Sequence, residues 1–120
     1  MAKLVKFYET GGPDVLRIED GSVGEPGPGE VRVRHVAAGL NFADTYFRSG
    51  TYKVPLPSGI GNEAAGVIEA VGAGVTHLAV GDRVTYTGFT NTLGAYSTDR
   101  LISADPLIKL PEAISCEVAA

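Results

Sequence analysis

The sequence predicts a mainly β protein: a closed or partly closed β-barrel with short helical segments. The 120-residue chain holds 16 glycines and 7 prolines, a composition that favours turns and short strands over long helices. At least seven short segments have the composition or alternation of strands, and one segment has helical spacing. The length is that of one domain and is sufficient to bury a core.

The strand patterns differ in strength along the chain. The clearest covers residues 30–38, where Val31, Val33 and His35 fall on one face and the arginines on the other. A lone histidine on an apolar face is usually a hydrogen-bonded core residue, so we expect that role for His35. A Gly-Gly-Pro turn separates the first two patterns and predicts a hairpin. The predicted strands are residues 3–8, 15–20, 30–38, 64–71, 83–86, 94–98, 102–104 and 107–110.

A helix of one or two turns is predicted over residues 41–48, where the strand pattern breaks. Phe42 and Tyr46 recur there at helical spacing, and either Asn41 or Asp44 is placed to cap the helix. Residues between Gly39 and Gly66 thus connect two strands through a helix and a Pro/Gly-rich loop.

A second helix start is predicted at the last residues of the chain. Ser115 is a suitable N-cap, and residues 116–120 suit a first helical turn. A helix that begins so late predicts that the chain is part of a longer protein. The alternative is a short frayed tail.

Asn41, Tyr46 and Tyr52 are the candidate ligand-binding residues. An amide offers donors and an acceptor, and a phenol is a neutral donor near pH 7. Such groups can hold a carbonyl or a ribose without the burial of a full charge. Taken residue by residue, a packing role is favoured for the tyrosines, and structural roles are favoured for Asp44 and Glu63 over an acid/base pair.

Composition excludes several classes of function. The net charge is −4 with no basic block, so nucleic-acid binding is not expected. No apolar run reaches the length of a membrane span, and the first residues lack a secretory signal, so a cytoplasmic protein is predicted. Two histidines and the single Cys116, which we expect to be inert, indicate no metal site. Residues 59–64 fit G-x-G-x-x-A but precede a strand pattern, so they are not a phosphate loop.

An ordered set of short motifs nevertheless resembles a known family. Together these motifs are similar to the zeta-crystallin-like, zinc-free branch of the medium-chain dehydrogenase/reductase superfamily, the NADPH-dependent quinone oxidoreductases. The resemblance covers essentially the whole chain, including the spacing. The motifs are GGPDVL at 11–16, GLNFADTY at 39–46, RSG at 48–50, GNEAAGVI at 61–68, VG at 71–72, VGDRV at 80–84 and GAY at 94–96.

The resemblance implies a fold and an activity. Residues 1–114 would form a GroES-like, partly open β-barrel domain on the substrate side. Residues 115–120 would begin the helix that leads to an NADPH-binding domain absent from this chain. The implied reaction is hydride transfer from NADPH to a quinone, by a protein that is often a homodimer. The chain alone would then be inactive.

The resemblance also implies site residues. Asn41 and Tyr46 would contact the cofactor, Tyr46 and Tyr52 would be catalytic, and Asp44 and Glu63 would support them. Zinc-dependent relatives have a cysteine at the position of Asn41 and a histidine at that of Asn62, so no zinc is expected. No site is expected in the loop at residues 87–92.

Two alternatives stay open. An enoyl or alkenal reductase of the same superfamily would use similar hydride transfer. A stand-alone GroES-like binding or assembly module would have no catalytic role.

Overall fold

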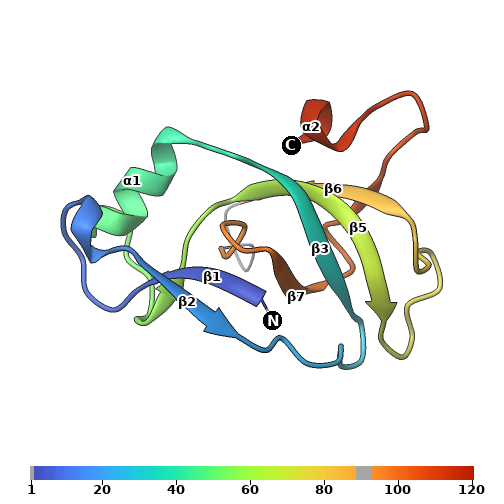
Figure 1. Cartoon of the computed structure of the whole chain (residues 1–120), viewed down its shortest axis with the longest axis horizontal. Helices are drawn as coiled ribbons and strands as arrows, with labels where there is room; N and C mark the ends of the chain where they lie inside the picture. The colour runs from blue at the N-terminus through green and yellow to red at the C-terminus, as the bar shows by residue number, and fades with distance from the viewer. Residues whose placement is uncertain (1, 89–92) are drawn as a thin grey trace.

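The computed structural model describes residues 2–88 and 93–120, and its strands form two antiparallel sheets (Figure 1). The smaller sheet has the order β2-β1-β4, with β1 at Ala2–Phe7, β2 at Arg17–Gly21 and β4 at Ser58–Gly59. The larger sheet has the order β7-β3-β5-β6-β8. Its strands are β3 Glu30–Gly39, β5 Glu63–Val71, β6 Arg83–Thr87, β7 Asp99–Ser103 and β8 Ile108–Lys109. The prediction of a mainly β fold is confirmed, and the described strands do not close into a barrel.

The predicted hairpin of the first two strands is present. β1 and β2 pair from Ala2 with Gly21 to Lys6 with Arg17. A 3-10 helix at Pro13–Val15 fills the turn, so β2 begins two residues later than expected. Proline suits such a helix start because its fixed φ is already helical.

The larger sheet carries the main core. β3 and β5 pair along most of their length, and the predicted inward face of β3 is buried. At Gly66 the two strands approach so closely that a Cβ atom would collide with the carbonyl group of Arg34. The core cluster consists of Val31, Val33, Ala64, Ile68, Leu78, Val84, Tyr86, Ala95, Ile102, Ala104 and Leu107.

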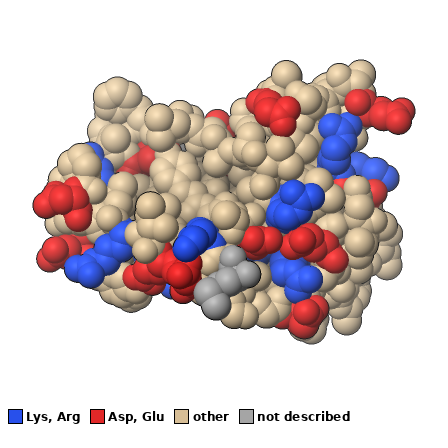
Figure 2. Space-filling view, in the orientation of Figure 1, with Lys and Arg blue, Asp and Glu red and all other residues tan. Residues whose placement is uncertain are grey.

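The arginines of β3 lie on the outer face, as predicted. The guanidinium group of Arg32 lies 2.9 Å from a carboxylate oxygen of Glu25 and 3.6 Å from one of Glu69. Arg34 lies 3.8 Å from the other oxygen of Glu69. On the face seen in Figure 2, acidic and basic side chains are interspersed around a largely uncharged central hollow.

His35 has the core role expected of it. Its Nδ1 lies 2.8 Å from the carbonyl oxygen of Ser97, and its Nε2 lies 3.0 Å from the hydroxyl oxygen of Tyr86. A carbonyl oxygen only accepts, so Nδ1 carries the proton and Tyr86 donates to Nε2. Arg100 in turn donates to the Tyr86 hydroxyl at 3.2 Å. Burial lowers the pKa of His35, and the positive charge of Arg100 lowers it further.

Both predicted helices are present. α1 spans Phe42–Ser49 and follows β3, and α2 spans Cys116–Ala119 near the larger sheet (Figure 1). The Ser115 hydroxyl oxygen accepts a hydrogen bond from the Val118 N–H at 3.2 Å, which confirms Ser115 as the N-cap. No helix within residues 2–88 and 93–120 is long and apolar enough to cross a membrane.

One predicted strand is wrong. Residues 94–98 are irregular, with a single isolated bridge from Ser97 to Leu4, and β7 begins only at Asp99. The backbone N–H groups of Gly94 and Tyr96 instead donate to the carbonyl groups of Gly61 and Ile60. The positive φ of Gly94, 128°, turns the chain away from a strand. No site was expected in the loop at 87–92, of which residues 89–92 lie outside the described residues, but Thr87 and Gly88 line a hollow at the start of α1.

Candidate active site

The start of α1 is fixed by a carboxylate within its first turn. Asn41 is the N-cap, with extended backbone at φ −124° and ψ 149°. Its N–H donates to Oδ2 of Asp44 at 3.1 Å, the reciprocal half of a capping box. Both predicted capping residues therefore contribute.

Asp44 is also the centre of a buried polar cluster. Its side chain is nearly inaccessible, with 3% of the residue exposed. Besides the Asn41 N–H, it accepts a hydrogen bond from Nδ2 of Asn62 at 2.9 Å and a short one from the hydroxyl group of Tyr96. A carboxylate with several donors is stable in a buried place because they replace its water. These contacts give Asp44 a structural role, while its support of catalytic residues stays a prediction.

Tyr96 acts only as a donor to this carboxylate. Burial, the hydrogen bond to Asp44 and the negative charge of Asp44 all raise the pKa of the Tyr96 hydroxyl well above its usual range. The phenol therefore stays protonated and keeps Asp44 in place.

Asn62 has one atom without a partner. Its side chain is buried, with 6% of the residue exposed, and Oδ1 has no hydrogen bond within the described residues. An orphaned buried acceptor costs about 1–3 kcal/mol. Because Nδ2 is held by Asp44, the unpaired oxygen is directed elsewhere. Such an atom commonly indicates a place for a ligand donor or an ordered water.

Aromatic side chains of α1 and of the loop after it form a cluster of ring contacts. The rings of Tyr46 and Tyr52 meet edge to face, with centroids 5.3 Å apart and planes at 71°. Tyr46 also contacts Phe42 at 5.9 Å, and Tyr52 contacts Phe47 at 5.3 Å. The Tyr52 N–H donates to the Tyr46 carbonyl at 3.0 Å, which holds the loop after the helix against it. Phe42 and the preceding Leu40 are 79% and 85% exposed.

Two hollows adjoin the start of α1. One has a volume of about 330 Å³, and Asn41, Asn62, Glu63 and Thr87 are among the residues that line it. The other, about 320 Å³, is mostly apolar and includes Leu40, Phe42 and Tyr96 in its wall. Asn41 lines both hollows, so it lies at their junction.

The predicted site residues fall into two groups. Tyr46 and Tyr52 are in ring contact with each other, and Asn41 lies at the start of the same helix. The tyrosines line neither hollow, and their hydroxyl groups have no hydrogen bond in the part of the chain that the structure describes. The supporting residue Glu63 begins β5, and its carboxylate occupies the space where a side chain at Gly39 would lie.

Sequence reasoning missed the roles of Asn62 and Tyr96. The sequence indicates Asn62 only through the resemblance, and the pattern around Tyr96 predicts a strand. Tyr96 lies 52 positions from Asp44, so no local spacing indicates the contact. Among residues 2–88 and 93–120 there is no group of three or more His, Cys, Asp or Glu side chains that could hold a metal ion.

The chain is thus a two-sheet β domain, with a capped helix after its longest strand and a hollow lined by Asn41 and Asn62 beside that helix. The chain belongs to the alcohol dehydrogenase GroES-like domain family, whose model matches residues 27–112. The expected GroES-like fold is therefore confirmed.

Several relatives are similar over nearly the whole chain. A quinone oxidoreductase of Pseudomonas aeruginosa is 54% identical over 100% of this chain and 37% of its own length. The crystal structure of Escherichia coli quinone oxidoreductase complexed with NADPH matches with a TM-score of 0.92 and 47% identity, over 98% of this chain and 36% of that one. A 2-haloacrylate reductase of a Burkholderia species is 44% identical over 93% of this chain and 34% of its own length.

The chain spans little more than a third of the length of these relatives. The expected resemblance to quinone oxidoreductases is confirmed at the level of this domain.

Proposed function

We propose that this chain forms the substrate-side wall of an NADPH-dependent quinone oxidoreductase, and that residues 1–114 are its GroES-like domain. The observation that carries the proposal is the hollow at the start of α1 that Asn41 and Asn62 line, since Asn62 Oδ1 is buried with no hydrogen-bond partner among the described residues. Similarity to quinone oxidoreductases over the whole chain supports it.

The residues present fit the nicotinamide end of the cofactor. A carboxamide or ribose needs neutral donors and acceptors, which Asn41, Asn62 and Thr87 offer around the 330 Å³ hollow. Among the described residues that line it, Glu63 is the only charged one, so these residues offer no cation for the phosphates. We therefore assign phosphate binding to a domain outside these 120 residues, to which residues 115–120 lead.

The chain's own residues would bind the cofactor and the quinone and orient them. The chemistry supplied by NADPH when bound is hydride donation, so that quinone, NADPH and a proton from water give hydroquinone and NADP⁺. Asp44 fixes the start of α1 and the Asn62 amide, which sets the positions of the amide groups in the hollow. Tyr46 and Tyr52 present two hydroxyl groups from one edge-to-face pair, and these can donate to a quinone oxygen as negative charge develops on it.

The test uses the parent protein that contains this chain. We expect NADPH oxidation with a quinone, and a fall in kcat/KM of about 10–100-fold for Tyr46→Phe or Tyr52→Phe, since each removes one donor. Tyr8→Phe, which alters an exposed tyrosine that lies under the guanidinium group of Arg17, is the matched control. Unchanged kcat/KM in both variants would show that neither tyrosine hydroxyl group takes part in the reaction.

A second candidate is reduction of an activated alkene. The relative that favours it is the 2-haloacrylate reductase. The same assay with a panel of quinones and 2-haloacrylates separates the two reactions. A kcat/KM higher for the alkenes than for every quinone would assign the second activity.

We also expect the 120-residue chain alone to be inactive, because the described residues of the hollow include no cation that could bind the phosphates. Quinone reduction by the isolated chain at the rate of the parent protein would contradict this expectation. A chain that binds a defined protein or peptide but whose parent oxidises no NADPH would instead be a binding module.

A further inference from the structure

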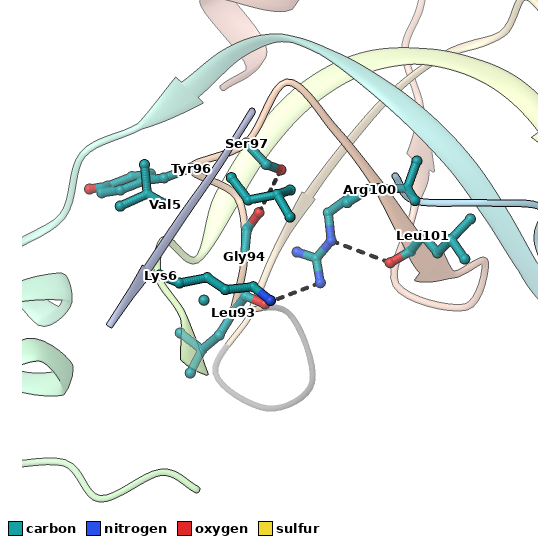
Figure 3. Close-up of a pocket in the computed structure, with 11 residues that line it drawn as sticks. Val5, Lys6, Leu93, Gly94, Tyr96, Ser97, Arg100 and Leu101 are labelled. Atoms are coloured by element: carbon teal, nitrogen blue, oxygen red, sulfur yellow. Dashed lines mark hydrogen bonds between the residues drawn. The ribbon is translucent and has the colours of Figure 1, made fainter. Parts of the chain in front are cut away.

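A separate hollow of about 270 Å³ lies between β1 and the segment that enters β7 (Figure 3). Its wall is partly apolar. Tyr96 also lines this hollow, but its hydroxyl group is bound to Asp44 and points away from Arg100 (Figure 3). The apolar lining residues are Leu4, Val5, Val23, Leu93 and Leu101.

Among the described residues that line this hollow, the two charged ones are both positive. Lys6 comes from β1 and Arg100 from β7, and Figure 3 shows both side chains directed into the same space. Gly59 and Gly94 also line the hollow, and they lie so close together that a Cβ atom at Gly59 would be only 3.0 Å from Cα of Gly94.

Several of the groups that hold the Arg100 guanidinium group in position are uncharged. It donates to the hydroxyl group of Tyr86 and to the carbonyl group of Leu93, each at 3.2 Å, and its Cζ lies 5.6 Å from the centre of the Tyr86 ring. These contacts orient a positive charge that is always present.

Lys6 lacks the kind of partner that other cations of the chain have. Lys3, Arg32 and Lys109 each form an ion pair with a carboxylate. Within residues 2–88 and 93–120 the Lys6 ammonium group has no ion pair or hydrogen bond. Arg17, directly opposite Lys6 in β2, adds positive charge to that face of the sheet, while Glu19, opposite Leu4, adds a carboxylate; neither lines the hollow.

Two cations that converge in a partly apolar hollow repel each other, and an anion between them removes that repulsion. The ammonium group offers three donors to such an anion, and the apolar wall favours a ligand with a hydrocarbon body. We propose that this hollow binds a small organic monocarboxylate. Its carboxylate lies between Lys6 and Arg100, and its apolar part lies against Leu4, Leu93 and Leu101.

The proposal is tested by NMR titration of the isotope-labelled chain. Benzoate is the probe, benzamide is its neutral analogue of the same shape, and inorganic phosphate is the anion without a hydrocarbon body. We expect saturable shifts of the amide signals of Gly94, Arg100 and Leu101 with benzoate, and none that saturate with benzamide. Equal binding of benzamide, or tighter binding of phosphate than of benzoate, would overturn the proposal.

The matched variants are Lys6→Gln and Lys53→Gln, which remove the same charge, the second from an exposed position that does not line the hollow. We expect Lys6→Gln to weaken benzoate binding by at least about tenfold and Lys53→Gln to leave it unchanged. The unchanged remainder of the spectrum checks that each variant is folded. Equal affinity of Lys6→Gln and the parent chain would show that Lys6 is not a ligand-binding residue. Neither probe requires NADPH, so the outcome is independent of the proposed oxidoreductase activity.

Discussion

The hydroxyl group of Tyr96 donates a hydrogen bond to the carboxylate of Asp44 across 52 positions of sequence. This contact ties the segment before β7 to the first turn of α1. Since Asp44 also holds Asn62 and the backbone of Asn41, one carboxylate joins three separate segments around the candidate active site.

Replacement of Asp44 by Asn should destabilise the chain strongly. The variant loses a buried charge that three donors satisfy, and we expect the free energy of unfolding to fall by about 3 kcal/mol. Urea denaturation measures the change. Asp20→Asn is the control: its ion pair with Lys3 is exposed, so we expect a loss of less than about 1 kcal/mol. Similar losses in both variants would refute the central role of Asp44.

Alkaline pH should weaken the chain through Tyr96. Its pKa in the folded state is raised above the ordinary value near 10, so the protonated phenol stabilises the fold below about pH 10, and this contribution is lost as the pH rises further. Tyr96→Phe should lower stability at neutral pH by about 1–2 kcal/mol and flatten the decline above pH 10. Urea midpoints measured from pH 7 to 11 check both effects. A decline of the same slope in the variant would assign it to other groups.

Mild acid should weaken the chain through His35. Its pKa is lowered by burial, so the unfolded chain binds a proton more readily than the folded one. The contribution of neutral His35 to stability is therefore fully present above about pH 6.5, and it is lost as the pH falls below that value. Thermal unfolding between pH 7.5 and 5 should show this slope, and His35→Asn should reduce it. His77→Asn, at an exposed position, should keep it.

Gly66→Ala should be among the most damaging single-methyl additions. The new Cβ atom would meet the backbone of Arg34 and His35, which cannot move without separating β3 from β5. We expect a loss of about 3 kcal/mol or more, as for overpacking against rigid backbone. Gly74→Ala is the comparison: nothing lies within 4 Å there, and its φ of 83° alone should cost about 1 kcal/mol. A smaller loss at residue 66 than at residue 74 would contradict the close approach.

Local patterns predicted most of the secondary structure. The alternation of Val31 and Val33 with arginines is a property of one strand, so residues 30–38 alone indicate β3 and its faces. The cap of α2 was likewise visible, because Ser115 lies three residues from the N–H that it binds.

Long-range contacts account for what the sequence did not predict. Residues 94–98 have the composition of a strand, yet Gly94 and Tyr96 donate to the loop at Gly61 and Ile60, a choice that only the folded chain determines. The same loop places Asn62 beside Asp44. The sequence could therefore indicate Asn41 and Asp44 as capping residues. It could not indicate the distant side chains that bind Asp44.

The exposure of Leu40 and Phe42 has a practical consequence for work with the chain in solution. Two large apolar side chains that face water, 85% and 79% exposed, favour self-association as the concentration rises. The net charge of −4 opposes it through mutual repulsion at neutral pH. Near the isoelectric point of about 5.0 that repulsion disappears, so concentrated samples should be kept well above it to stay monodisperse.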